Sequence, residues 1–126
     1  MVRAQQAIIF IAFSVLYPMA AAQGVRPETV ASGLQNPWAV AFLPGGRFLV
    51  SERGGRLRVV EPDGRLSKPI EGLPEMSAGG QGGLLDVLLD ADFASNRTLY
   101  FCFSEPASLG NGNSTALARA TLNADM

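Results

Sequence analysis

Hydrophobic and polar residues alternate in short runs along most of the chain, and glycine, proline, asparagine and aspartate separate these runs. A period of two is typical of strands in a half-buried sheet, and the separating residues are typical of tight turns. No segment carries apolar residues at helical spacing over three turns. We therefore predict an all-β fold with strands over residues 29–34, 38–43, 47–53, 56–60, 84–89, 98–104 and 115–122.

Turn residues set the predicted connections between these strands. Gly54-Gly55 predicts a two-residue hairpin loop, because glycine adopts the positive φ angles of such loops without strain. Residues 90–97 (DADFASNR) predict a turn in which Asp90 and Asp92 bond to nearby backbone groups.

Several charged residues lie near that hairpin loop. Glu52 and Arg53 could pair with nearby charges, but solvated charges at an exposed strand end are the default expectation. We also predict that Arg53, Arg56 and Arg58 form a solvent-facing basic strand.

The chain contains an internal repeat. PWAVAFLPGGRFLVSERGGRLRVV, and GLLDVLLDADFASNRTLYFCFSEP followed by TALARATL, share the order of apolar strand, turn, aromatic-rich strand, loop and amphipathic strand. Trp38 and Leu84 mark equivalent positions about 46 residues apart, a period typical of β-propeller blades. About three such units are normally needed for stability, so we expect residues 23–126 to be the first two blades or so of a truncated propeller.

Residues 1–22 are predicted to be a signal peptide. Arg3 is a short positive region, residues 7–16 are apolar, and the small residues at 20–22 suit cleavage before Gln23. A membrane anchor is the alternative, but a spanning helix needs about 20 apolar residues, and Pro18 interrupts this run.

Composition narrows the chemistry. The formal net charge of −1 supplies no field for nucleic acid or anionic lipid, so neither is an expected partner. The absence of histidine removes the commonest general base and metal ligand. Cys102 is the only cysteine, so it has no disulfide partner in the chain, and its apolar neighbours predict a buried, inert thiol.

The glycine cluster at residues 79–83 (GGQGG) is the main candidate for ligand binding. Leu85 stands where a dinucleotide fingerprint needs its third glycine, and the cluster lacks the lysine and hydroxyl residue of a phosphate-binding loop. Its backbone can still approach a ligand closely, and Gln81 offers an amide donor and acceptor suited to a sugar hydroxyl. The alternative is a surface glutamine in a flexible connection.

The aspartates at 86, 90 and 92 do not form a calcium loop, because Ala94 and Ser95 occupy positions where the loop pattern needs a ligand and a glycine.

Three segments together resemble the glucose/sorbosone dehydrogenase family, and more narrowly its soluble aldose sugar dehydrogenases. They are LQNPWAVAFLPGGRFLVSERGGRLRVVEPDG, GQGGLLDVLLDADFASNRTLYFCFSEP and STALARATL. The most specific part is GQGGLLD at residues 80–86, followed by Asp92-Phe93 and Asn96-Arg97.

The resemblance implies a six-bladed propeller that binds pyrroloquinoline quinone (PQQ) and calcium and oxidises the anomeric hydroxyl of aldoses to lactones, with an external electron acceptor. In the family a histidine takes the hydroxyl proton, calcium polarises the quinone, and the glutamine matched by Gln81 lines the sugar site. In the family that histidine lies just downstream of the strand that matches residues 115–122, and the groups that hold PQQ and calcium lie in later blades. We therefore expect no catalytic, cofactor-binding or metal-binding residue in this chain, and no activity from it alone.

Two other functions stay open: a secreted, non-enzymatic propeller that binds or scaffolds, and a different propeller enzyme such as a lactonase. A lactonase would place metal-binding carboxylates in its central channel, and nothing here resembles that cluster. The signal peptide and PQQ use favour a periplasmic or secreted protein, and a homodimer is left open.

Overall fold

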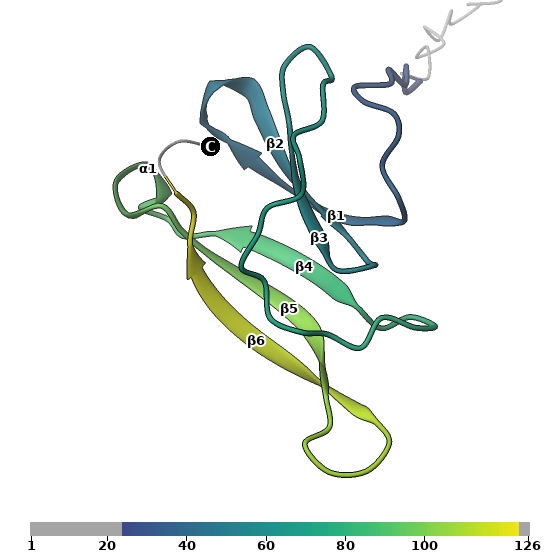
Figure 1. Ribbon diagram of the computed structural model, residues 1–126. Helices are drawn as coiled ribbons and strands as arrows, with labels where there is room; N and C mark the ends of the chain where they lie inside the picture. Colours follow the sequence, from purple (N-terminus) through teal and green to yellow (C-terminus); the bar gives the residue numbers. More distant parts are fainter. Residues whose placement is uncertain (1–23, 124–126) are drawn as a thin grey trace, which may run out of the picture.

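The computed structural model describes residues 24–123 and contains two three-stranded antiparallel sheets (Figure 1). The first sheet has the order β1 (Pro37–Leu43), β2 (Arg47–Glu52), β3 (Arg56–Val60), and the second has β4 (Leu84–Leu89), β5 (Thr98–Pro106), β6 (Asn113–Thr121). A 3₁₀ turn η1 (Pro44–Gly46) and a one-turn helix α1 (Phe93–Asn96) lie in the connections. The all-β prediction is confirmed, and the predicted signal peptide lies outside the described residues.

Six of the seven predicted strands are present, and the one over residues 29–34 is wrong. Residues 24–36, here called the leader, have no regular secondary structure. The leader is fixed by other means: the backbone N–H of Gln35 donates to the carboxylate of Glu52, and the carbonyl of Asn36 accepts from the N–H of Arg53 at 3.0 Å. Side-chain and turn partners thus replace the ladder that a strand would need.

The core lies between the two sheets. Alternate residues of each strand point into it, as the period of two requires. It comprises Ala41, Leu43, Leu49, Leu57 and Val59 from the first sheet and Leu84, Val87, Leu99, Phe101 and Phe103 from the second, with Phe93 and Leu122 at one end. Burial of such side chains contributes about 1.5–3 kcal/mol each, so this face-to-face contact is the main stabilising term.

The outer faces of both sheets are also apolar. Phe42 of the first sheet is 74% exposed and Leu117 of the second is 71% exposed, with Val40 and Leu88 beside them on the same faces. A blade of a propeller is covered on both faces by neighbouring blades, and exposed apolar side chains such as these are typical of a face that a further blade covers.

An irregular segment extends the first sheet beyond β3. Ser67 N–H donates to Val59 O at 2.8 Å, Ile70 N–H donates to Leu57 O at 2.8 Å, and Val60 pairs with Leu66 as an isolated bridge. Propeller blades are typically four-stranded, and this segment takes the place of a fourth strand.

The hairpin between β2 and β3 has three loop residues, not the predicted two. Glu52 pairs with Arg56, so Arg53 belongs to the loop with Gly54 and Gly55. The Gly55 N–H donates to Glu52 O at 2.9 Å, and the φ of Gly55 is 98°. A turn closed by one residue with positive φ is the usual form of a three-residue hairpin loop.

The two sheets meet where this loop approaches the first residues of the second sheet. Leu84 N–H donates to Arg53 O at 3.0 Å. Gly83 has a φ of 137°, and a Cβ there would lie 1.8 Å from Arg53 O. Only glycine fits that position, because the Cβ would overlap the carbonyl and the backbone conformation is unfavourable for other residues.

We predict that Gly83→Ala lowers the free energy of unfolding by more than about 2 kcal/mol, through overlap and backbone strain together. Urea denaturation of the purified protein measures this. Gly79→Ala is the control, because a Cβ at Gly79 has no atom within 4 Å and Gly79 lacks a positive φ. Equal midpoints for the two variants would contradict the account.

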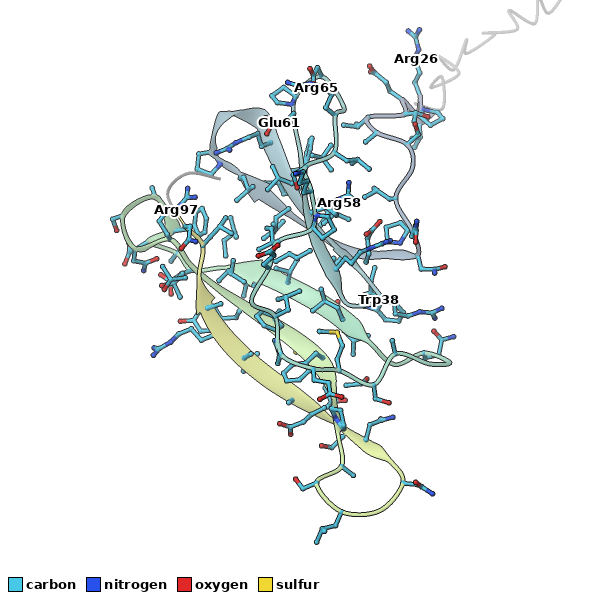
Figure 2. The ribbon with its side chains drawn as sticks, viewed as in Figure 1. Arg26, Trp38, Arg58, Glu61, Arg65 and Arg97 are labelled. Carbon is cyan, nitrogen blue, oxygen red and sulfur yellow. The ribbon has the colours of Figure 1, made fainter. Side chains whose placement is uncertain are left out.

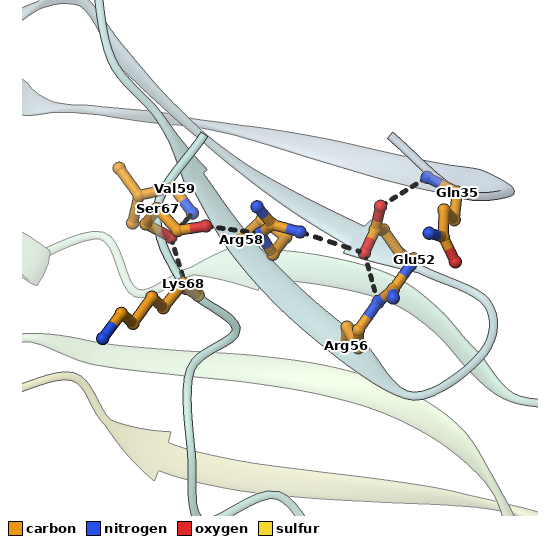
Figure 3. A network of polar contacts seen from close by, with 7 residues as sticks. All are labelled: Gln35, Glu52, Arg56, Arg58, Val59, Ser67 and Lys68. Atoms are coloured by element: carbon orange, nitrogen blue, oxygen red, sulfur yellow. Dashed lines mark hydrogen bonds and ion pairs between the residues drawn. The ribbon is translucent and has the colours of Figure 1, made fainter. Parts of the chain in front are cut away.

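A buried carboxylate ties the leader to β2 and β3 (Figure 3). Glu52 is 0% exposed; its Oε2 accepts from Arg56 Nε at 2.6 Å and lies 4.0 Å from Arg58 Nη1. Arg58 Nε in turn donates to Ser67 O at 2.6 Å. The prediction of solvated charges is therefore wrong for Glu52 and the two β3 arginines, because the leader and residues 67–68 cover this face of the sheet.

We predict that Glu52→Gln lowers the free energy of unfolding by about 3 kcal/mol, since it leaves guanidinium groups partly buried without their counter-charge. Asp63→Asn is the matched control: it removes the exposed 2.7 Å ion pair between Asp63 and Arg65 and should lower the denaturation midpoint much less than Glu52→Gln does. A Glu52→Gln midpoint equal to that of the wild type would show that the cluster does not stabilise the fold.

Candidate functional site

The glycine cluster forms a tight loop with Gln81 at its tip. Gly82 N–H donates to Gly79 O at 2.7 Å, and Gly79 N–H donates to Gly82 O at 3.3 Å. Gly80, which has a φ of 53°, and Gln81 are the two residues between them. The loop projects beyond the start of β4 (Figure 1).

The base of the glycine loop is fixed on β5. Gly83 N–H donates to Ser104 Oγ at 3.0 Å, and Ser104 N–H donates back to Gly83 O at 2.9 Å. Ser104 O also accepts from Ser77 N–H at 2.8 Å. A Cβ at Gly82 would lie 2.9 Å from Ser104 Oγ. The loop therefore presents Gln81 from a constrained base.

Arg53 contacts Gln81 across the junction between the sheets. Its Nη1 donates to Gln81 Oε1 at 3.2 Å. Between the glycine loop and the β2–β3 loop lies a hollow of about 190 Å³, lined by Asn36, Arg53, Gly54, Ala78, Gly79, Gly80 and Gly82. Much of this lining is backbone without side chains, so a ligand can approach the main chain closely.

Trp38, labelled in Figure 2, shares a neighbouring hollow with two residues that line this one, Asn36 and Arg53. The residue is 45% exposed, and its Nε1–H donates to Asp86 Oδ1 at 3.2 Å, which links β1 to β4. Trp38, Asn36, Pro37 and Arg53 line an adjoining hollow of about 240 Å³. An aromatic face beside amide and guanidinium donors suits a ligand that has both apolar C–H faces and hydroxyls.

The sequence identified only Gln81 of this group as a site residue. In the sequence, Trp38 only marked equivalent positions of the repeat, and Arg53 was predicted to be a solvated charge. Their proximity depends on how the two repeats pack, which no local pattern encodes; the matching positions of Trp38 and Leu84 in the repeat were the available signal.

Of the three aspartates that fail to match a calcium loop, Asp86 lies on β4 and accepts from Trp38, whereas Asp90 and Asp92 lie in the β4–β5 connection. Asp90 Oδ1 accepts from Asp92 N–H at 3.0 Å and from Asn96 Nδ2 at 2.9 Å, while Tyr100 Oη donates to Asp90 Oδ2 at 3.0 Å. The predicted turn bond is confirmed for Asp90, whereas the Asp92 carboxylate makes no capping bond to α1. These donors, the Asp92 N–H foremost, hold the pKa of Asp90 below its usual 3.8.

Within residues 24–123, no three His, Cys, Asp or Glu side chains gather where they could hold a metal ion.

Cys102 is only partly buried, so the prediction of a buried thiol is wrong. It lies on the outer face of the second sheet, where it lines a hollow with Leu88, Tyr100 and Leu117. The apolar residues around Cys102 led to the wrong prediction of burial. Alternate residues of β5 face the core and the outer surface, and Cys102 faces the outer surface.

Comparison with known proteins identifies the family. Residues 34–126 match the model described as Glucose / Sorbosone dehydrogenase. The chain belongs to this family. Its match to the aldose sugar dehydrogenase YliI of Escherichia coli (strain K12) is 41% identical over 108 residues, and covers 85% of this chain and 29% of that protein.

Solved structures of the family share the fold. A glucose dehydrogenase superimposes with a TM-score of 0.73 at 44% identity, over 78% of this chain and 28% of that one. The PQQ-bound form of an aldose sugar dehydrogenase from Streptomyces coelicolor superimposes with a TM-score of 0.67 at 33% identity, over 79% and 28% of the two chains. The chain thus spans less than a third of the length of these relatives.

The two sheets of this family member are two consecutive blades of a β-propeller, as the repeat predicted. The glycine loop and the β2–β3 loop both lie at the junction between them. Among residues 24–123, no helix is long and apolar enough to cross a membrane.

We predict that Asp90→Asn destabilises the protein at neutral pH and that this destabilisation becomes smaller in acid. A carboxyl whose folded-state pKa is depressed stabilises the fold above the unfolded value of 3.8, and this contribution is lost as the pH falls through the lower folded value. Urea midpoints of wild type and variant, measured at about pH 7 and about pH 3, check this. A difference that is the same at both pH values would contradict it.

Proposed function

We propose that the whole protein of which these residues form part is a PQQ-dependent dehydrogenase that oxidises the anomeric hydroxyl of aldose sugars to lactones. Membership of the family supports the dehydrogenase activity, and the relatives that are sugar dehydrogenases support the substrate class. The observation that carries the proposal is the placement of Gln81 at the tip of a constrained loop whose glycines line an open hollow.

In this proposal Gln81 binds the sugar. Its amide group points from a loop whose neighbours lack side chains, so a sugar ring can approach without steric conflict. An amide hydrogen bond to one hydroxyl, with Trp38 beside the hollow, fixes which face of the ring is presented. These contacts position the anomeric carbon and do not themselves remove its hydrogen.

The oxidation removes the anomeric O–H proton and the C1 hydride together, and leaves the lactone. PQQ and calcium, when bound, supply the electron acceptor and the positive charge beside it. The chain has no histidine, so in this proposal other blades of the whole protein supply the base, and those blades also hold PQQ and calcium.

The exposed outer faces of the sheets fit the same proposal. Phe42 and Leu117 would be covered by neighbouring blades of the closed propeller, which removes the unfavourable exposure of apolar surface. We further propose a periplasmic or secreted location, with the sugar and a diffusible electron acceptor as partners; the apolar, arginine-containing start of the chain supports it.

The test is reconstitution of the purified whole protein with PQQ and calcium, followed by dye reduction with a panel of aldoses. We expect sugar-dependent reduction that requires both additions. A protein that stays inactive with every aldose would contradict the proposal and favour a binding or scaffolding propeller.

We predict that Gln81→Ala lowers kcat/KM for the best aldose about tenfold or more, because it removes a hydrogen bond to the sugar. Asn111→Ala, in the exposed loop between β5 and β6, is the control and should match the wild type. Unchanged kinetics in Gln81→Ala would exclude the assigned role.

A further inference from the structure

We propose that Arg53 is a positioning residue that fixes the orientation of the Gln81 amide, so that Gln81 offers N–H donors to the sugar. This inference rests on the proposed function. It assigns a direction to the hydrogen bond and a role to a residue that the sequence presents as a solvated charge.

The direction follows from the donors of arginine. A guanidinium has five N–H donors and no acceptor, so only the oxygen of a neighbouring amide can face it. Arg53 Nη1 lies 3.2 Å from Gln81 Oε1, which directs the Nε2 group of Gln81 away from the guanidinium. An amide held in this way donates to an oxygen lone pair of the ligand.

The backbone of Arg53 is held on both sides. Its N–H donates to Asn36 O at 3.0 Å, and its carbonyl accepts from Leu84 N–H at 3.0 Å. The adjacent Glu52 is fixed by Arg56 and the leader. The Arg53 side chain therefore extends from a backbone that two hydrogen bonds fix, at a residue that lines the hollow.

The Gln81 side chain has no comparable constraint of its own. It is exposed at the tip of a loop between glycines, and its amide can rotate freely without a partner. The hydrogen bond from Arg53 reduces this freedom before the sugar binds, which lowers the cost of ordering the side chain on binding.

A double-mutant cycle on the reconstituted whole protein tests this inference. Arg53→Met should lower kcat/KM for the best aldose about three- to tenfold, and Arg53→Lys, which keeps one donor, should lower it less. In a Gln81→Ala background, Arg53→Met should have no further effect, because the group that it positions is gone. Arg65→Met, at an exposed arginine remote from the hollow, is the control and should match the wild type.

Several kinetic outcomes would overturn the inference. Wild-type kinetics in Arg53→Met would refute the role of Arg53 alone and leave the proposed function standing. An equal loss in both backgrounds would show that Arg53 supports the fold or contacts the sugar directly. If the wild type oxidises no aldose, the proposed function is wrong and the sugar role of Arg53 is refuted with it.

A second readout is independent of activity. The side-chain amide signals of Gln81 in a ¹⁵N NMR spectrum, assigned by their loss in Gln81→Glu, should shift in Arg53→Met and stay in place in Arg65→Met. Signals of Gln81 that are identical in the wild type and Arg53→Met would show that the hydrogen bond is not formed in solution.

Discussion

The contact between the Arg53 carbonyl and the backbone of Gly83 and Leu84 is the constraint on which the rest of the structure depends. A hydrogen bond of 3.0 Å, from Leu84 N–H to Arg53 O, joins the β2–β3 loop of the first sheet to the start of β4 in the second. The contact also requires a residue without Cβ at position 83. Because β4 begins there, the same contact sets how the apolar faces of the two sheets meet and where the glycine loop that carries Gln81 stands relative to the β2–β3 loop.

Consecutive residues of the β2–β3 hairpin have opposite roles in this arrangement. Glu52 points into the covered face of the sheet, where Arg56 and Arg58 neutralise it, and it stabilises the hairpin and the leader. Arg53 is the first residue of the loop and lines the hollow, and its guanidinium donates to Gln81. The buried ion cluster thus holds the backbone from which a ligand-facing side chain extends, which is how a rigid element supports a site.

Much of the fold could be predicted from the sequence, since period-two alternation and turn residues act locally; β3 and β4 were predicted to the residue. The predictions that were wrong concern burial, which depends on packing between segments distant in the chain. The burial of Glu52 requires the leader to fold over the sheet, and the exposure of Cys102 requires knowing which face of β5 meets the core. Gln81 could be singled out by the glycines around it, whereas Arg53 becomes its neighbour only after two repeats have packed together.

The most direct test of the account is a crystal structure of the whole protein with PQQ, calcium and a bound aldose. The account predicts a hydrogen bond of about 3 Å from Gln81 Nε2 to an oxygen of the sugar, with Gln81 Oε1 still bonded to Arg53. A sugar bound in the propeller without any contact to the glycine loop, or an amide whose oxygen faces the sugar, would contradict it.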